Sequence, residues 1–264
     1  MKLDIMLKEV GNAVRDAGAF LMGEYNNFDR NRVELKRPGD LVSYVDRESE
    51  LLLKSKLSDI CPEAGFIAEE SFEGRIKEGL NWVIDPLDGT TNFVHKIPSF
   101  GVSVALMHFD AILLGIVYNP AVSEVFEASQ GAPSLLNGRP ICVSRCYRKE
   151  DALFGTGLPV TNFDRLPDML QTIDVLARNS RGVRRLGAAS IDLCYVACGR
   201  LDAFFECNLS PWDVAAGALI VQQAGGIVSD FSGGRNFIFG REIVAAGASL
   251  YPEFLSILKD KFGV

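Results

Sequence analysis

The sequence predicts a protein of the α/β class, with an N-terminal half built around an antiparallel sheet and a C-terminal half in which helices and strands alternate. Three patterns carry this prediction. Apolar residues recur every three or four positions near the N-terminus, they recur every second position within residues 99–128, and short apolar runs alternate with helical patterns beyond residue 150. The sequence contains no low-complexity linker, so we expect the division into residues 1–145 and 146–264 to be a change of layer and not a flexible hinge.

The N-terminal half begins with a helix that we expect to end near Tyr25. Its apolar stripe consists of Leu7, Val10, Val14, Ala17 and Leu21. Residues 26–38 are polar and indicate an exposed loop or hairpin, whose four basic side chains are Arg30, Arg32, Lys36 and Arg37. A second helix is expected over residues 46–58. Short buried strands are expected over residues 65–68 and 82–84, each followed by acidic residues.

An antiparallel meander should follow, and beyond it a layer of alternating helices and strands. The strands of the meander are expected at residues 102–106, 112–118 and 124–128, with turns at Asp110 and at Asn119-Pro120. In the C-terminal half the expected strands cover residues 153–156, 203–206, 226–230 and 243–246. The expected helices cover residues 164–177, 188–198, 213–224 and 252–262.

The composition is that of a globular protein and narrows the class of partner. Of 264 residues, 48% are apolar and 23% are charged, which excludes a disordered or collagen-like chain. The net charge of −7 at pH 7 disfavours direct contact with a nucleic-acid backbone and favours a small-molecule substrate. No uncharged apolar run reaches the roughly 18 residues of a membrane span, and the first residues lack a signal-peptide core. We therefore expect a soluble, cytoplasmic protein without a membrane partner.

The cysteine and histidine content favours free thiols and a metal site built from oxygen. The six cysteines are Cys61, Cys142, Cys146, Cys194, Cys198 and Cys207. A chain of this length buries an adequate core without disulfides, and the sequence has no C-x-x-C pair. Only two histidines, His95 and His108, could complete a zinc shell. Any metal should therefore have mainly oxygen ligands, which points to a hard ion such as magnesium.

The most specific motif is the string D-P-L-D-G-T-T-N-F, from Asp85 to Phe93, which follows an apolar strand. Two carboxylates three residues apart, with Pro86 fixing the backbone between them, can converge on one cation, and the Leu87 carbonyl can join them. Gly89 permits a tight turn, and the threonines after it suit the start of a helix whose N–H groups attract an anion. The structural alternative is an Asx turn followed by a capped helix.

Three further segments each have a purely structural explanation as well. Residues 210–213 have the spacing of a capping box, and the small residues after them would let the helix pack closely on another backbone. Glu69 and Glu70 follow an apolar strand, and either a cation or a solvated loop would compensate their repulsion. Residues 36–46 form a basic loop and then a helix start that Ser43 would cap.

Taken together, these four segments resemble the inositol monophosphatase family of magnesium-dependent, lithium-sensitive phosphatases. The resemblance covers essentially the whole chain and is strongest at D-P-L-D-G-T-T-N-F-V-H, residues 85–95, and at W-D-x-A-A-G, residues 212–217. It implies a layered α/β/α/β/α sandwich of the sugar-phosphatase type, commonly a homodimer. The active site would lie between an N-terminal antiparallel-sheet half and a C-terminal α/β half.

The resemblance also implies roles for individual residues. Two or three Mg²⁺ ions would be held by Glu69, Asp85, the Leu87 carbonyl, Asp88 and Asp213. The catalytic residues would be Glu69 and Thr90, which orient the attacking water, Asp46, which holds an outer-shell water, and Lys36, in a loop beside the site. The substrate contacts would be Asp88, Gly89, Thr90, Gly187, Ala189 and Glu206, with Glu206 accepting the substrate hydroxyls.

The implied reaction is the magnesium-dependent hydrolysis, by metal-activated water, of a small polyol or sugar phosphate monoester, with myo-inositol 1-phosphate as the first candidate. No His or Cys nucleophile is needed, so His95 is expected to be structural. Three positions depart from common family usage. Ser43 and Ala68 are conservative changes, whereas Ala188 lacks a hydroxyl near the substrate.

Two alternatives stay open. A related phosphatase would act on fructose 1,6-bisphosphate, histidinol phosphate or a nucleotide phosphate, although nucleotide-type relatives usually have D-G-T-K/R-E-F where this chain has Thr91, Asn92 and Phe93. A protein of a different class would regulate by binding the transcription machinery, as some bacterial relatives do. The acidic net charge disfavours direct RNA contact but allows a protein partner.

Overall fold

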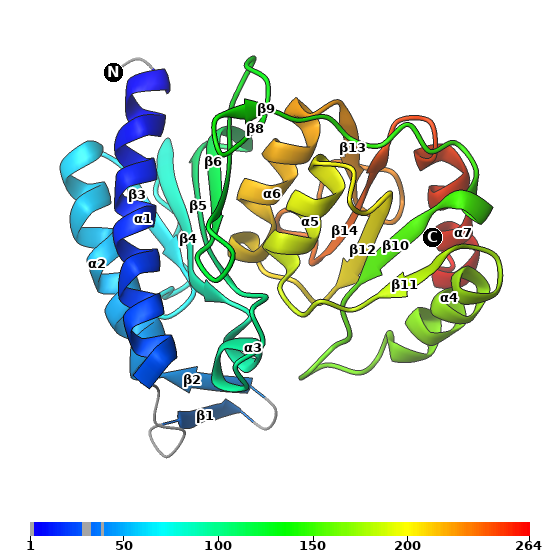
Figure 1. Cartoon of the computed structure of the whole chain (residues 1–264), viewed down its shortest axis with the longest axis horizontal. Coiled ribbons are helices and arrows are strands. Elements are labelled where there is room, and N and C mark those ends of the chain that lie inside the picture. Colours follow the sequence, from blue (N-terminus) through cyan, green and yellow to red (C-terminus); the bar gives the residue numbers. More distant parts are fainter. Residues whose placement is uncertain (1–2, 28–32, 38–39) are drawn as a thin grey trace.

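The chain folds into five layers of helices, sheet, helices, sheet and helices, which follow one another from left to right in Figure 1. The computed structural model describes residues 3–27, 33–37 and 40–264, with the backbone alone for residues 33–37 and 40–43. The expected α/β/α/β/α sandwich is confirmed. Within the described residues, no helix is both long enough and apolar enough to cross a bilayer.

The first two layers are a helix pair and a seven-stranded sheet. The helices are α1 (Leu3–Asn27) and α2 (Tyr44–Ile60). The strands lie in chain order: β3 (Gly65–Ala68), β4 (Leu80–Asp88), β5 (Gly101–His108), β6 (Ala111–Asn119), β7 (Glu124–Ser129), β8 (Leu135–Leu136) and β9 (Arg139–Pro140). β3 is parallel to β4 and all later pairs are antiparallel, which confirms the meander. The sequence does not predict β8 and β9, because two residues carry no periodicity.

A small hairpin stands apart from this sheet. β1 (Val33–Arg37) pairs antiparallel with β2 (Asp40–Ser43), so a hairpin is present but lies later in the chain than the loop or hairpin expected over residues 26–38, and its second strand replaces part of the loop expected after Lys36. Arg30 and Arg32 fall outside the described residues, and so do the side chains of Lys36 and Arg37. The short helix α3 (Thr90–Val94) lies next to β2 in Figure 1 and directly follows β4.

The remaining layers come from the C-terminal half. The second sheet has the order β11-β10-β12-β14-β13. Its strands are β10 (Leu153–Thr156), β11 (Gly182–Arg184), β12 (Ala203–Cys207), β13 (Gly226–Ser229) and β14 (Glu242–Gly247). The helices are α4 (Leu166–Arg178), α5 (Ala189–Ala197), α6 (Pro211–Gln223) and α7 (Tyr251–Phe262), each within three residues of its predicted bounds at both ends. A 3₁₀ turn at Lys149–Asp151 and the three-residue β11 have no counterpart in the sequence prediction.

Three apolar cores separate the layers. The middle one lies between the two sheets around α5 and α6, and it joins Ile67 and Val83 of the first sheet to Leu193 and Val214 of the two helices. Residues from both sides of position 145 therefore share one core. The six cysteines are free thiols, as expected.

Helix α6 packs with its backbone against the first sheet. A Cβ atom added to Gly115 of β6 would lie 2.9 Å from the Cα atom of Ala216, so the strand and the helix touch with hardly any side chain between them. The small residues after Asp213 allow this approach, as the sequence predicts. The close packing fixes the N-terminal end of α6 against the end of the first sheet.

Candidate active site

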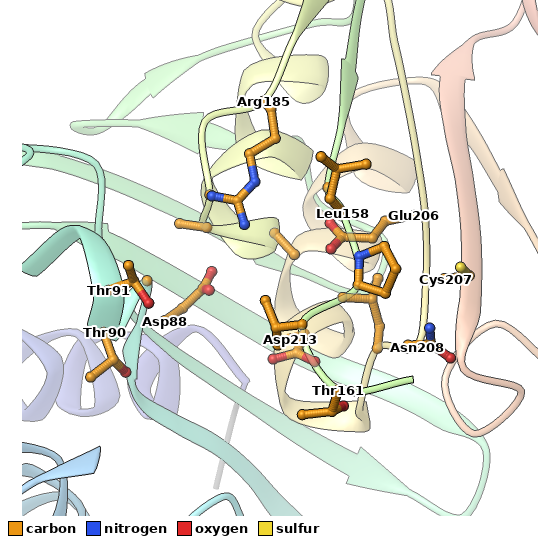
Figure 2. A pocket seen from close by; sticks show the side chains of 18 residues that line it. Asp88, Thr90, Thr91, Leu158, Thr161, Arg185, Glu206, Cys207, Asn208 and Asp213 are labelled. Atoms are coloured by element: carbon orange, nitrogen blue, oxygen red, sulfur yellow. The ribbon is translucent and has the colours of Figure 1, made fainter. Parts of the chain in front are cut away.

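Three acidic residues from two halves of the chain meet at one point. Asp85 and Asp88 lie at the end of β4, and Asp213 lies in the first turn of α6. One carboxylate oxygen of each lies within 4.8 Å of those of the other two. Figure 2 shows Asp88 and Asp213 on opposite sides of a common space.

A β-bulge makes Asp85 and Asp88 converge. Asp85 pairs with Ser103 and Asp88 pairs with Gly101, so three steps along β4 correspond to two steps along β5. In a regular strand, residues three apart point to opposite faces, whereas one extra residue returns them to the same face. The bulge contains Pro86, whose carbonyl accepts a hydrogen bond from the buried Ser49 hydroxyl at 3.0 Å. The acids therefore lie within β4, and not after it as the sequence predicts.

Asp213 is held by the start of its own helix. The backbone N–H of Ser210 donates to the Asp213 carboxylate at 2.6 Å, which confirms the predicted capping box. The Ser103 hydroxyl of β5 donates to the Trp212 carbonyl at 3.1 Å, tying this turn to the strand that pairs with Asp85. The structural explanation of this segment is therefore confirmed, and the same turn places the Asp213 carboxylate next to Asp85 and Asp88.

Asp88 has a partner that the sequence does not reveal. Its carboxylate accepts the backbone N–H of Ser190 at 2.8 Å and the Ser190 hydroxyl at 2.5 Å. Ser190 is the second residue of α5, so Asp88 caps that helix from the other half of the molecule. A serine in the first turn of a helix was the available signal, but its partner lies 102 positions away.

The three carboxylates repel one another in a site shielded from water. Burial, with the charges of Glu69, Asp88 and Asp213, raises the pKa of Asp85 well above its ordinary value. Burial raises the pKa of Asp88 as well, although the bonds from Ser190 counteract part of this effect. Burial and the charge of Asp88 raise the pKa of Asp213 to about 7. A divalent cation with oxygen ligands would remove this repulsion, so the donor set fits a hard ion such as Mg²⁺.

Glu69 lies near the three aspartates but outside their close group. It is half-buried in the turn after β3, and its N–H donates to the Ile84 carbonyl at 3.2 Å. Among the described residues the group within 4.8 Å contains the three aspartates alone, while Glu69 acts on Asp85 through its charge.

Thr90 links the cluster to α2. Its hydroxyl lies 3.0 Å from a carboxylate oxygen of the buried Asp46 and 3.1 Å from the Leu87 carbonyl. A hydroxyl has one proton, so it donates to one of these acceptors at a time. Donation to Asp46 leaves the Leu87 carbonyl available to a cation. The Leu87 N–H donates to Asp85 at 3.0 Å, which holds the loop in shape.

Two glycines allow the loop after β4 to pack closely against the C-terminal half of the chain. Gly89 has φ 88°, and a Cβ atom there would lie 2.9 Å from the Ser99 carbonyl and 3.2 Å from the Cβ of Ala188. Gly187 has φ 87°, and its Cβ would lie 2.7 Å from a guanidinium nitrogen of Arg185. Both positions need glycine for their backbone conformation, and Gly89 needs it for space as well because its neighbour is a backbone carbonyl.

A cavity of about 210 Å³ opens beside the aspartates, between the two halves of the chain (Figure 2). Its lining includes Asp88, Thr90, Gly157, Arg185, Glu206 and Asp213. Glu206 comes from β12, and burial together with the charges of Asp213 and Asp88 raises its pKa well above the ordinary value. A Cβ atom added to Gly157 would lie 1.8 Å from a Glu206 carboxylate oxygen, so Gly157 makes room for this group.

Seven of the predicted site residues line this cavity: Asp88, Gly89, Thr90, Gly187, Ala189, Glu206 and Asp213. Asp85 joins them through the aspartate cluster, and Asp46 and the Leu87 carbonyl join them through the Thr90 hydroxyl. Glu69 is not in the lining and acts on Asp85 through its charge. The Lys36 side chain lies outside the described residues. His95 is exposed just after α3 and does not line the cavity. Sequence reasoning missed Ser190, Gly157 and Arg185.

Comparisons with known proteins agree with this geometry. The profile of the "Inositol monophosphatase family" matches residues 3–261. The putative Nus factor SuhB of Neisseria meningitidis serogroup B is 42% identical over 247 residues, which cover 93% of this chain and 95% of that protein. The inositol-1-monophosphatase of Mesorhizobium japonicum is 37% identical over 261 residues, 98% of each chain. The structure of inositol monophosphatase from Anabaena superposes with a TM-score of 0.87 at 31% identity, covering 98% of this chain and 97% of that one. Since the profile, the sequences and the fold agree over nearly the whole length, the chain belongs to the inositol monophosphatase family.

Proposed function

We propose that the protein hydrolyses the phosphate monoester of a small polyol or sugar in a magnesium-dependent reaction, with myo-inositol 1-phosphate as the first substrate to test. One observation carries the proposal. Three aspartates, of which Asp85 and Asp88 are buried and Asp213 is half-buried, converge on one point, and a cavity beside them is lined by two of them and by a fourth carboxylate, Glu206. Family membership supports phosphatase activity.

Asp85, Asp88, Asp213 and the Leu87 carbonyl would hold the metal ions, with Glu69 beside them. Bound Mg²⁺ would neutralise phosphate charge, lower the pKa of a water and stabilise the entering and leaving oxygens. The protein contributes rigidity to this site. The bulge fixes Asp85 and Asp88, the capping box fixes Asp213, and Ser190 fixes the carboxylate of Asp88.

Thr90 would orient the attacking water. When its proton is donated to Asp46, the lone pairs of its oxygen are free to accept a hydrogen bond from water. Glu69 would accept a second hydrogen bond from the same water. The water would then be held by two acceptors with an oxygen lone pair directed at phosphorus, as an in-line displacement requires.

The loop after β4 would bind the phosphate. Gly89 and Thr90 stand where β4 passes into α3, and their N–H groups belong to the unpaired donors that open a helix. Glu206 and Gly157 would define the subsite for the alcohol. An ionised carboxylate accepts hydrogen bonds from neighbouring ring hydroxyls and donates none, which favours a polyol over a second phosphate.

Two measurements test the proposal. Phosphate release from myo-inositol 1-phosphate should stop in excess EDTA, return with Mg²⁺ and fall at millimolar Li⁺. A panel of about a dozen esters, including fructose 1,6-bisphosphate, histidinol phosphate and nucleotide phosphates, should rank polyol phosphates first by kcat/KM. Undiminished hydrolysis in EDTA would contradict the role of the aspartates, and a preference for a nucleotide phosphate would contradict the role of Glu206.

A second candidate function is regulatory, because several relatives are named Nus factors. The protein would then bind a protein of the transcription machinery, since its net charge of −7 disfavours direct contact with RNA. Affinity capture from a bacterial lysate, with and without Mg²⁺, tests this role, and a metal-site variant separates it from hydrolysis. We also expect a homodimer, which sedimentation equilibrium would measure.

A further inference from the structure

Asp192 is a buried acid without a hydrogen-bond partner. It lies in the first turn of α5 with 1% of its surface exposed. Both of its carboxylate oxygens are fully buried, and neither has a partner among the described residues. The mechanism above does not use it. Burying an ionised carboxylate without a hydrogen-bond partner is costly, so the neutral acid is favoured. A buried polar group without a partner also requires an explanation of its role.

Asp192 and Glu206 lie beside two glycines at the end of β10. Gly155 belongs to β10, and Gly157 directly follows its last residue, Thr156. A Cβ atom at Gly155 would lie 3.3 Å from a carboxylate oxygen of Asp192, and one at Gly157 would lie 1.8 Å from a carboxylate oxygen of Glu206. The two acids therefore lie near each other beside a short stretch of chain that carries no side chain at either glycine, and the charge of Glu206 acts on Asp192.

The charges around Asp192 favour its neutral form. Burial, followed by the negative charges of Glu206 on β12 and Asp88 on β4, raises the pKa of Asp192 well above its ordinary value. Arg185 is the one cation whose charge acts in the other direction. Its side chain is exposed, lines the cavity, and forms no ion pair in the described part of the chain.

We propose that Asp192 is a positioning residue for Glu206: a neutral carboxylic acid whose hydroxyl donates to the Glu206 carboxylate through one buried water. The proton stays on Asp192, which is 1% exposed, and Glu206 is the ionised group because it is half-buried and lines the cavity. Glu206 is thereby held in an orientation that accepts substrate hydroxyls from the cavity. The inference rests on the proposed function, because it assigns Glu206 to the alcohol subsite.

The first test compares three variants on two substrates. Asp192→Asn keeps a neutral donor of similar shape, Asp192→Ala removes it, and Val196→Ala removes fully buried side-chain volume elsewhere on α5. For myo-inositol 1-phosphate, Asp192→Ala should lower kcat/KM about tenfold, mainly through KM, while Asp192→Asn stays within about threefold. For p-nitrophenyl phosphate, which has no polyol hydroxyls, all three variants should stay within about threefold.

The double variant sharpens this test. In a Glu206→Gln background, Asp192→Ala should cause little further loss, because the two residues would act on one contact. Equal losses on both substrates, additive losses with Glu206→Gln, or an Asp192→Asn variant as impaired as Asp192→Ala would each overturn the proposal.

A second readout does not depend on activity and remains usable if Asp192→Ala fails to fold. A neutral Asp192 keeps its proton in the folded state, but the unfolded chain loses it above a pH of about 3.9. The wild type should therefore lose stability as pH rises from about 4 toward the raised pKa, and Asp192→Asn should not lose that contribution. The Tm of metal-free Asp192→Asn minus that of the wild type should grow with pH between 4 and 8. Glu206 and Asp88 interact with Asp192, but an asparagine and a neutral aspartic acid present the same charge to them, so their contributions cancel in the difference while Asp192 is neutral. A difference that stays constant or turns negative at pH 8 would mean an ionised Asp192 and overturn the proposal.

The outcomes also separate this inference from the proposed function. If the wild type hydrolyses no polyol phosphate, or if Glu206→Gln changes nothing, the assignment of the alcohol subsite is wrong whatever Asp192 does. If Glu206→Gln impairs the polyol phosphate selectively and Asp192→Ala does not, the assignment of Asp192 alone is wrong.

Discussion

The two walls of the cavity are built in opposite ways. One wall, which would hold the metal under the proposed function and is called the metal-side wall, comes mainly from one continuous segment, the end of β4 and the loop after it, to which α6 adds Asp213. The other wall, which would hold the alcohol and is called the hydroxyl-side wall, is collected from separate places: Gly157 after β10, Arg185 before α5, and Glu206 on β12. The acids of the metal-side wall repel one another, whereas on the hydroxyl-side wall the charge of Glu206 acts on a second acid, Asp192.

Under the proposed function, the metal-side wall supports the reaction and the hydroxyl-side wall recognises the alcohol. A continuous segment keeps its internal geometry when surrounding loops change, so it suits a reaction that every substrate shares. A wall collected from several elements can change one residue at a time, so it suits the choice of alcohol. Damage to the first wall should affect all phosphate esters, and damage to the second should affect those with hydroxyls to recognise.

The largest effect is expected from Asp88→Asn. The change removes one of the charges that would hold the cation, while the amide oxygen can still accept the N–H of Ser190. We expect kcat to fall by about 100-fold or more on both myo-inositol 1-phosphate and p-nitrophenyl phosphate, with the circular dichroism spectrum unchanged. A loss limited to the polyol phosphate would place Asp88 on the hydroxyl side and break the comparison.

The next effect should be selective. Glu206→Gln removes the charge that accepts ring hydroxyls, and each such bond to a charged group contributes roughly 1.5–3 kcal/mol. We expect kcat/KM for myo-inositol 1-phosphate to fall about ten- to a hundredfold, while p-nitrophenyl phosphate changes little. Steady-state kinetics on both substrates decide the point. Equally large losses on both would make Glu206 part of the metal network, and no loss on either would make it a structural residue.

The contrast between the walls also explains what sequence reasoning can and cannot find. Most of the metal-side wall is one short sequence motif, so Asp85, Asp88 and the glycine after them could be predicted as site residues from the sequence alone. The exception is the β-bulge, which places these acids inside the strand; Pro86 within an apolar run was its visible sign. The helices were predictable because each carries several turns of apolar spacing.

The hydroxyl side was harder to predict because its residues acquire their roles from partners far along the chain. Gly157 is an ordinary loop glycine until Glu206 occupies the space beside it. Ser190, which holds Asp88 of the metal-side wall, was missed for the same reason, because it is an ordinary helical serine until Asp88 lies beside it. No local pattern encodes such a pair. Glu206 itself was found through family resemblance and not through its spacing.

A smaller effect on the same wall is expected from Gly157→Ala. The new methyl group would overlap the Glu206 carboxylate, and this flexible side chain can move aside more easily than backbone could. We expect kcat/KM for myo-inositol 1-phosphate to fall about tenfold, because the displaced carboxylate loses a bond of about 1.5 kcal/mol, with p-nitrophenyl phosphate unaffected.

Two comparisons show whether this effect passes through Glu206. In a Glu206→Ala background the Gly157→Ala change should cost nothing more, since the overlapping atoms are gone. Gly23→Ala is the matched control, because a Cβ atom there meets nothing within 4 Å and the residue lies in α1. A Gly157→Ala enzyme with normal kinetics on the polyol phosphate would show that the carboxylate has a second productive position.

The smallest effect concerns Ala188, where the two walls touch. Ala188 is the N-cap residue of α5, and its side chain provides no cap. Serine at an N-cap stabilises a protein by about 0.5–2 kcal/mol relative to alanine. Here Asp88 already accepts the N–H of Ser190, one of the donors that a cap would satisfy, so Ala188→Ser should fall at the low end. We expect a Tm increase of about 1–2 °C and kcat/KM within about twofold on both substrates. Ala189→Ser is the control, because Ala189 also lines the cavity but lies inside the helix. If Ala188→Ser instead raised kcat/KM for myo-inositol 1-phosphate alone and left the Tm unchanged, its hydroxyl would be reaching the substrate. The missing hydroxyl would then be a determinant of the alcohol, and position 188 would belong to the hydroxyl-side wall.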